Sequence, residues 1–353
     1  MDISQVDKNF LIETKISRTD IKFYDVKNSP FEISGVFYED GAFRRIPESV
    51  AKATNDGVVS LHTNTAGGRI RFKTNSSYIA INAKMSGLGK MPHFAFTGSM
   101  GFDLYMKSNG KDIYINTFVP PFNVLDGYEG IIEFASTKEK EITINMPLYS
   151  SVKELYVGLS EDAVVLPPEP YSIEKPIVYY GSSITQGGCA SRPGMAYEAI
   201  ISRKLNFDYI NLGFSGNAKG EDAIANYIAD IDMSMFVYDY DHNAPSLEHL
   251  MNTHQRMFNI IRDKNPDLPI ILLSRPKYLL NLEEEKRFEI IKRTYDNAVC
   301  SGDENVYLIK GTKLMEVAKW EGTVDNCHPT DFGFVSMANA LIPVISKIFQ
   351  KNN

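Results

Sequence analysis

The sequence predicts two domains: an amino-terminal all-β domain of the sandwich or jelly-roll type and a carboxyl-terminal α/β domain with a five-stranded parallel sheet. Three observations lead to this prediction. The chain has 353 residues, enough for two domains that each bury a core. Short strands and polar turns fill its first half, and strand–loop–helix repeats fill its second half. A proline-rich segment separates the halves, so the predicted domains cover residues 1–168 and 169–353.

The first half, from about Phe31 to Leu159, shows the period of two that is typical of strands. Arg69–Lys73 alternates strictly between charged and apolar residues, and Ile79–Ala83 continues the alternation after a polar turn. Further short runs of this kind lie at 111–115, 130–134 and 141–145. No helix of normal length is predicted here. We therefore expect a β-sandwich or jelly roll.

The segment Val165–Pro176 contains four prolines and no amphipathic period, which predicts a stiff linker. Five apolar strands then alternate with helices, a pattern typical of a parallel sheet covered on both faces by right-handed crossovers. The predicted strands are 177–180, 209–212, 235–240, 269–273 and 306–309. The predicted helices are 196–205, 221–229, 246–262, 283–299 and about 332–349.

Charge and hydropathy exclude several partners. The net charge is −7 and no long basic run is present, so nucleic acid is not an expected partner. No apolar run approaches the ~20 residues that a membrane span needs. Met1–Lys8 has no apolar signal core. A full-length chain is therefore expected in the cytoplasm, and a chain that has lost a leader in the periplasm or outside the cell.

The three cysteines are Cys189, Cys300 and Cys327, an odd number at wide spacing. This usage fits a reducing compartment and excludes a disulfide scaffold. A structural zinc site requires about four nitrogen or sulfur ligands at short spacing, which the sequence does not supply. No metal is therefore expected.

Ser183 follows the strand Ile177–Tyr180, at the sheet edge where open α/β proteins bind ligands. Serine is a poor nucleophile without a base held beside it. Asp325 and His328 lie one turn apart near the carboxyl terminus, and a carboxylate at this spacing can orient the imidazole. An isolated D-x-x-H is more often a solvated aspartate and a surface histidine.

Two loops between these segments could bind an oxyanion. Gly213–Asn217 follows a strand, and its glycines allow backbone N–H groups to face a ligand. Asn243 lies just beyond the next strand, and its amide can donate a hydrogen bond. Either loop alone could be a plain turn. The order of serine, asparagine, aspartate and histidine along the chain is the specific signal.

These segments resemble the four sequence blocks of the SGNH, or GDSL-type, esterases and lipases. Tyr180–Thr185 resembles the first block, Asn211–Gly216 the second, Asp241–Asn243 the third and Asp325–Pro329 the last. The resemblance implies a three-layer, flavodoxin-like α/β fold for the second domain. It also implies a serine esterase that needs no metal or organic cofactor.

The same resemblance implies the roles of the residues. Ser183 would be the nucleophile, with Asp325 and His328 as its triad partners. The oxyanion hole would be formed by the backbone N–H groups of Ser183 and Gly216 and by the side chain of Asn243.

Two positions depart from the family pattern, with Ser182 in place of an aspartate and Asp241 in place of a glycine. Gln186–Gly194 and Gly101–Tyr105 resemble a branch in which a β domain with a G-x-D-L-Y motif precedes the SGNH domain. The β domain is expected to be a fixed platform, with the Gly101–Tyr105 loop near the cleft; a merely stabilising domain is the alternative.

The resemblance implies short acyl esters as substrates, such as O-acetyl groups on carbohydrate or other small molecules. The alternatives are a lysophospholipase or thioesterase, and a non-catalytic carbohydrate-binding protein. His242, Arg192 and Arg275 are candidate substrate contacts, although structural roles are as common for such residues. The other histidines are isolated in sequence and are interpreted as structural: His62, His93, His249 and His254.

Overall fold

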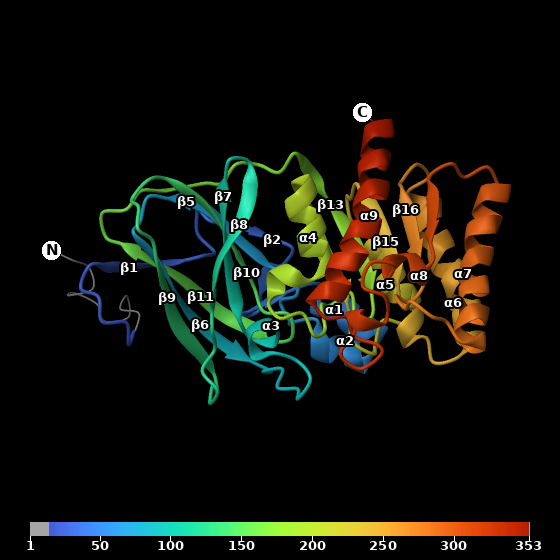
Figure 1. Ribbon diagram of the computed structural model, residues 1–353, viewed down its shortest axis with the longest axis horizontal. Helices are drawn as coiled ribbons and strands as arrows, with labels where there is room; N and C mark the ends of the chain where they lie inside the picture. The colour runs from blue at the N-terminus through green and yellow to red at the C-terminus, as the bar shows by residue number, and fades with distance from the viewer. Residues whose placement is uncertain (1–13, 353) are drawn as a thin grey trace.

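The computed structural model describes residues 14–352 and places a β-rich domain beside an α/β domain (Figure 1). The segment Met1–Lys8, considered above for a leader, lies outside the described residues. Both expected domain types are present, so the predicted fold class is confirmed.

The first domain packs two antiparallel sheets around an apolar core. One sheet has the order β1-β11-β6-β9, and the other has the order β12-β5-β10-β7-β8, with β2 also paired to β5. Inward-facing residues of both sheets, such as Ile81 and Phe72, meet in this core. The strands of the domain are β1 (Ile21–Asp25), β2 (Glu32–Ser34), β3 (Phe37–Glu39), β4 (Ala42–Arg44), β5 (Arg69–Thr74), β6 (Tyr78–Ser86), β7 (Phe102–Ser108), β8 (Lys111–Phe118), β9 (Gly127–Glu133), β10 (Lys140–Asn145), β11 (Ser151–Ser160) and β12 (Val165–Leu166).

The second domain has a five-stranded, all-parallel sheet in the order β14-β13-β15-β16-β17. In chain order this is 2-1-3-4-5, the flavodoxin-like arrangement. Its strands are β13 (Ile173–Gly181), β14 (Phe207–Gly213), β15 (Met235–Asp239), β16 (Ile270–Leu273) and β17 (Val306–Ile309). Its helices are α4 (Tyr197–Leu205), α5 (Asp222–Ala229), α6 (Leu247–Lys264), α7 (Leu282–Cys300), α8 (Gly311–Leu314) and α9 (Asp331–Asn352).

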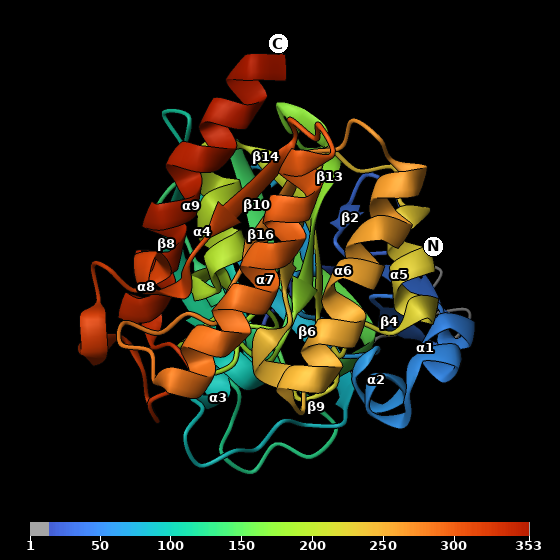
Figure 2. The ribbon, with the colours of Figure 1, turned by 90° about the vertical axis from the view of Figure 1, so that its right-hand side faces the viewer.

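Helices cover both faces of this sheet (Figure 2). Tyr179 of β13 points into a core shared with α4 and α9, whereas its neighbour Tyr180 points into a core shared with α5, α6 and α7. Because alternate side chains of a strand face opposite sides, a strand covered on both faces is apolar throughout. This is why the apolar runs of the sequence identified the strands.

Capping residues fix where the two long helices of one face begin. The Asn281 side chain accepts from the backbone N–H of Glu284, whose carboxylate accepts in turn from the Asn281 N–H, a capping box that starts α7. The Ser246 side chain accepts from the His249 N–H at the start of α6.

The predicted linker is shorter than expected. Val165–Leu166 pairs with β5 as β12, and Ile173 already belongs to β13. The pairing of β13 with β14 shifts register between Ile173 and Ile177, a stretch that contains Pro176. Because proline lacks an N–H, it is tolerated in a strand at such irregularities.

The first domain contains short helices that its alternating pattern did not predict: α1 (Glu48–Thr54), α2 (Asp56–Leu61) and α3 (Phe96–Ser99). Ala51 of α1 and Val58 of α2 are fully buried, and they pack in the core of the second domain together with Ile224 of α5. Figure 2 shows α1 and α2 beside α5. The first domain thus supplies part of the outer layer of the second.

Helix α9 combines length with apolar composition. Its stretch Asp331–Lys351 has a mean hydropathy of 1.6, so among the described residues one helix could cross a membrane by length and composition alone. The sequence analysis predicted a helix here, at about 332–349, but not one long and apolar enough to span a membrane. Six of its side chains are fully or almost fully buried in the core shared with α4: Phe334, Met337, Ala338, Leu341, Ile345 and Ile348.

Candidate active site

The structure joins Ser183, His328 and Asp325 in one chain of hydrogen bonds. The Ser183 Oγ lies 2.9 Å from the His328 Nε2, and the His328 Nδ1 lies 2.8 Å from the Asp325 Oδ2. The other carboxylate oxygen accepts from the backbone N–H groups of His328 at 2.7 Å and Cys327 at 3.1 Å. Burial acts to raise the pKa of Asp325, but these hydrogen bonds and the nearby imidazole outweigh it and lower the pKa to about 2.

A tight loop before α9 brings Asp325 and His328 together. The Val324 N–H donates to the His328 carbonyl at 2.8 Å, and Thr323 and Pro329 form an isolated β-bridge across the loop base. Asn326 takes a left-handed conformation with φ of 64°, which asparagine tolerates better than most residues. Asp325 and His328 are therefore brought together by a closed loop rather than by a turn of helix.

Ser183 follows a turn that only a glycine allows. A Cβ at Gly181 would lie 2.1 Å from the Asp239 carbonyl oxygen, so β13 and β15 could not approach there with a larger residue. The Ser183 carbonyl accepts from the Gly188 N–H at 2.8 Å and from the Tyr149 hydroxyl at 3.2 Å. The nucleophile is thus held from both the second and the first domain.

The three groups predicted to form an oxyanion hole have N–H donors that the described part of the protein leaves available. Within the described residues, the N–H groups of Ser183 and Gly216 donate to no other protein group. Gly216 has a φ of 70° and open space where a Cβ would stand. The Asn243 amide uses one N–H to hold the Phe214 carbonyl at 2.9 Å, which leaves its second N–H. These are the donors that an oxyanion hole requires.

Gln186 positions the second of these loops, a role that the sequence did not reveal. Its carbonyl oxygen accepts from the Ser215 N–H at 3.0 Å. Its amide donates to the Asn64 side chain and to the Leu148 carbonyl, both at 3.1 Å, and both partners belong to the first domain. Only the fold brings these residues together.

Arg45 of the first domain supports the same loop from a fully buried position. Its guanidinium donates to the carbonyls of Asn211 and Gly213 and lies 4.5 Å over the Phe214 ring. Burial lowers the pKa of Arg45 to about 9. An arginine buried among carbonyl groups has no sequence pattern by which it could be recognised.

Asp241, which replaces the usual glycine of the third block, is a buried anchor. The Arg275 Nε lies 3.1 Å from its carboxylate, and the Arg287 Nε lies 2.7 Å from it. These ion pairs hold the short 3₁₀ helix Asp241–Asn243, which carries the Asn243 amide. The Arg275 guanidinium also contacts Glu284, and a contact with substrate stays a prediction.

His242 lies beside the catalytic loop. Its Nδ1 is 3.7 Å from the Cys327 Sγ, and its Nε2 is buried without a hydrogen-bond partner among the described residues. Burial, assisted by the nearby Arg275, lowers the pKa of His242 to about 3. A neutral, half-buried imidazole lies between the two loops here, and whether it also contacts substrate stays a prediction.

The G-x-D-L-Y motif contacts the loop that follows the nucleophile. Asp103 is fully buried and accepts from the Arg192 Nη1 at 2.9 Å, the Gly194 N–H at 2.9 Å and the Asn145 side chain at 2.7 Å. Arg192 also donates to the Tyr105 hydroxyl. The motif therefore holds the Arg192 guanidinium, and a contact of Arg192 with substrate stays a prediction.

One further residue of the first domain reaches the triad. The ring of His93 lies 5.7 Å from that of His328. His93 looked isolated in the sequence, because its neighbour in space is more than two hundred residues away in the chain.

Comparison with known proteins gave two family matches and several similar solved structures. Residues 174–346 match the GDSL-like lipase/acylhydrolase family, and residues 21–165 match the amino-terminal GxDLY domain of SGNH-hydrolase-type esterases. A candidate GDSL-like lipase from Bacteroides ovatus ATCC 8483 is 32% identical, with a TM-score of 0.84 over 94% of this chain and 98% of that one. A search of curated proteins gave no match.

Two more distant structures share the fold. The salicylyl-acyltransferase SsfX3 from a tetracycline biosynthetic pathway is 18% identical, with a TM-score of 0.75 over 94% of this chain and 98% of that one. A family two carbohydrate esterase from Clostridium thermocellum is 14% identical, with a TM-score of 0.62 over 91% of this chain and 99% of that one.

Proposed function

The chain belongs to the GDSL-like lipase/acylhydrolase family and is a carboxylic ester hydrolase, and we propose that it removes short acyl groups, such as acetyl, from carbohydrates or other small molecules through an acyl-serine intermediate. The observation that carries the proposed mechanism is the hydrogen-bonded chain from Ser183 through His328 to Asp325.

In the first half-reaction the Ser183 Oγ attacks the acyl carbon while the His328 Nε2 takes the hydroxyl proton. The carbonyl oxygen becomes an oxyanion that accepts hydrogen bonds from the N–H groups of Ser183 and Gly216 and from the Asn243 amide. His328 then gives its proton to the leaving alcohol, and the ester bond breaks. The product is an acyl ester on Ser183.

In the second half-reaction water replaces the alcohol. His328 takes a proton from the water as its oxygen attacks the acyl carbon, and returns that proton to the Ser183 oxygen as the acyl–enzyme bond breaks. Asp325 stays ionised throughout, because its pKa is held at about 2, and it orients the imidazole through Nδ1.

Crowding beside the triad supports a short acyl group. A Cβ at Gly188 would lie 3.0 Å from the Tyr149 hydroxyl and 3.3 Å from the His328 Cδ2, so the wall next to the imidazole is closely packed. A small acyl group fits such a wall better than a long chain does.

A pocket next to the catalytic loop supports a carbohydrate or similar leaving group. Tyr278, Trp320 and Asn326 are among its lining residues, and the two aromatic rings meet edge to face at 5.5 Å. Aromatic faces beside a few polar groups are a common lining for small-molecule sites. The carbohydrate esterase that shares this fold makes O-acetylated sugars the first substrates to test.

The test combines covalent labelling with a substrate panel. A serine-directed phosphonate should label Ser183 in the wild type and in Ser182→Ala, and should label no residue in Ser183→Ala. In a panel of esters graded by acyl length, acetyl esters should give the highest kcat/KM. A preference for long acyl chains would favour a lysophospholipase or thioesterase instead. Labelling of Ser182 would overturn the assignment of the nucleophile, and absence of label would favour a non-catalytic binding protein.

A further inference from the structure

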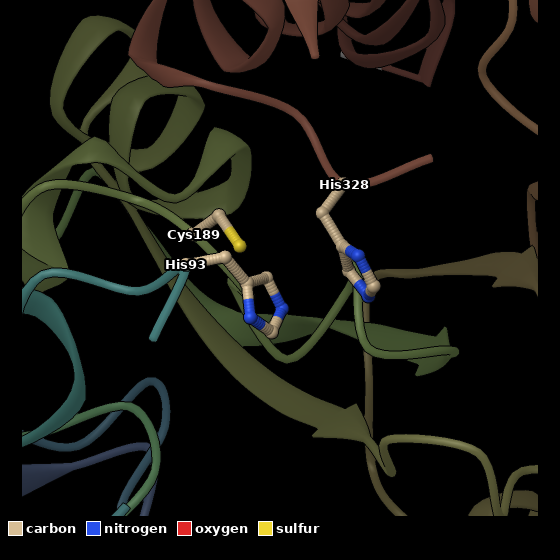
Figure 3. A group of neighbouring side chains, drawn as sticks. All are labelled: His93, Cys189 and His328. Carbon is tan, nitrogen blue, oxygen red and sulfur yellow. The ribbon is translucent and has the colours of Figure 1, made fainter. Parts of the chain in front are cut away.

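Three side chains with metal-binding atoms converge beside the triad (Figure 3). His93 comes from the first domain, Cys189 from the loop after the nucleophile, and His328 from the triad itself. One ligand atom from each residue lies within 4.8 Å of the other two. None of the three is adjacent to another in sequence, which is why ligand spacing did not predict a site.

We propose that His93, Cys189 and His328 bind a divalent transition metal of the Zn²⁺ type, and that the bound ion inhibits ester hydrolysis by occupying the His328 imidazole. Two imidazoles and one thiolate form a donor set that Zn²⁺ accepts, with a fourth position left for water. The inhibitory effect rests on the proposed function, whereas metal binding does not.

The triad itself prepares His328 as a ligand. The Asp325 carboxylate holds the Nδ1 at 2.8 Å, so the proton sits on Nδ1 and the lone pair sits on Nε2. A carboxylate behind a ligating histidine is the arrangement that orients imidazoles at zinc sites. Because Nε2 is also the atom 2.9 Å from the Ser183 Oγ, metal binding and proton transfer exclude each other.

Cys189 is fixed in place for this role. It is buried, it has a left-handed φ of 73°, and the turn around it is closed by a bond of 3.1 Å from the Ala190 N–H to the Gly187 carbonyl. Metal binding converts its thiol to a thiolate and releases the proton to solvent, while both imidazoles bind in their neutral form. The charge of the site therefore rises by one when a divalent ion binds.

His93 supplies the adjustable ligand. Its side chain is exposed and makes no hydrogen bond to any described residue, and its ring is tilted by 54° to that of His328. Zinc–ligand bonds of about 2.0–2.3 Å place tetrahedral ligand atoms roughly 3.5 Å apart, so the group must contract by about 1 Å. The exposed His93 can make that movement without disturbing a core.

The test uses the full-length chain and separates binding from inhibition. Zn²⁺ titrated calorimetrically should bind one per chain to the wild type and to Ser183→Ala. Co²⁺, used as a spectroscopic probe, should give thiolate-to-cobalt charge-transfer absorption in both. His93→Ala and Cys189→Ser should each weaken Zn²⁺ binding at least tenfold, and Cys189→Ser should remove the charge-transfer band.

Matched controls exclude adventitious binding. Cys300→Ser removes an exposed thiol of α7, and His249→Ala removes a histidine that is bonded to the Lys219 carbonyl; neither should change Zn²⁺ binding. Inhibition of ester hydrolysis is measured for each variant relative to its own rate without metal. The Zn²⁺ concentration that halves this rate should be at least tenfold higher for His93→Ala than for the wild type.

Full affinity in both His93→Ala and Cys189→Ser, or no Zn²⁺ binding by the wild type at micromolar concentration, would overturn the proposal. Because His93 is exposed, its substitution tests the site even if Cys189→Ser fails to fold. If the wild type hydrolyses no ester, calorimetry and the cobalt spectrum still decide whether the site exists. Failure of the proposed function is thereby distinguishable from failure of the metal site.

Discussion

Asp103 of β7 and Arg192 of the loop after Ser183 form an ion pair of 2.9 Å across the boundary between the two domains. The Asp103 carboxylate is completely buried, and only 17% of the Arg192 side chain is exposed. The Gly194 N–H and the Asn145 amide complete the ring of donors around the carboxylate. The characteristic motif of the first domain is therefore a clamp on the loop that supports the nucleophile.

Breaking this clamp should cost far more stability than breaking a surface pair. Asp103→Asn removes the charge that offsets Arg192, and loss of one partner from a buried pair typically costs about 3–5 kcal/mol. Unfolding in denaturant should show that the free energy of unfolding falls by an amount near the lower value, since Arg192 is partly exposed. Steady-state kinetics should show a reduced kcat/KM. Arg256→Gln, which breaks an exposed pair with Asp222, should cost less than about 1 kcal/mol. Equal losses of stability in the two variants would mean that the buried Asp103–Arg192 pair contributes no more than a surface pair.

Asp325→Asn should lower kcat by about 10⁴-fold, which is the loss typical of serine-protease triads when the carboxylate becomes an amide and the wrong imidazole tautomer is favoured. Since the pKa of Asp325 is about 2, its carboxylate is ionised at neutral pH, and the full loss is expected there. Steady-state kinetics at several pH values provide the measurement.

Asp331→Asn is the matched control for this substitution. Asp331 is the next carboxylate along the chain, and it accepts from the Ser191 N–H at 2.8 Å rather than from His328. We expect Asp331→Asn to retain most of the activity. A comparable loss in both variants would mean that the carboxylate partner of His328 has been misassigned.

Asn243→Ala should lower kcat by about 10²–10³-fold with little change in KM, because an oxyanion donor acts mainly in the transition state. The substitution also removes the hydrogen bond to the Phe214 carbonyl, so a thermal melt must show that the variant is folded. If KM rises while kcat is unchanged, Asn243 would be a substrate contact instead.

Asp239→Asn should be more stable than the wild type, and this difference in stability should increase as the pH rises from 5 to 8. Burial, with Asp241 nearby, raises the pKa of Asp239 to about 8, and neither carboxyl oxygen has a hydrogen-bond partner among the described residues. Between about pH 4 and pH 8 the folded state keeps a proton that the unfolded state has lost, so the wild type loses stability as the pH increases. The amide cannot ionise and avoids this loss.

The measurement is the difference in Tm between Asp239→Asn and the wild type at pH 5, 6, 7 and 8. The difference should grow by several degrees over this series. Asp232→Asn, at a carboxylate that is 77% exposed, should show no such trend. A constant difference for Asp239→Asn would mean that this carboxyl group is ionised in the folded protein.

Sequence reasoning succeeded where a local pattern has one structural outcome. The strands of the second domain were predicted because each must be apolar on both faces, as Tyr179 and Tyr180 show. The pairing of Asp325 with His328 was predicted because a spacing of three residues lets one loop hold both.

Sequence reasoning did not reveal contacts between residues that are distant in the chain. The ion pairs of Arg192 with Asp103 and of Arg275 with Asp241 are identified only by the fold. His93 looked isolated for the same reason. An arginine or histidine carries no local sign of which buried group it will meet.

The packing of α1 and α2 against the second domain has a consequence for synthesis. The ribosome makes Ala51 and Val58 long before it makes Ile224, which belongs to the same apolar core in the finished protein. The nascent chain must therefore expose an apolar face of its first domain until α5 has emerged, and such faces are what chaperones bind and what drives aggregation. We infer that the amino-terminal domain completes its fold only late in translation, when the second sheet is being assembled.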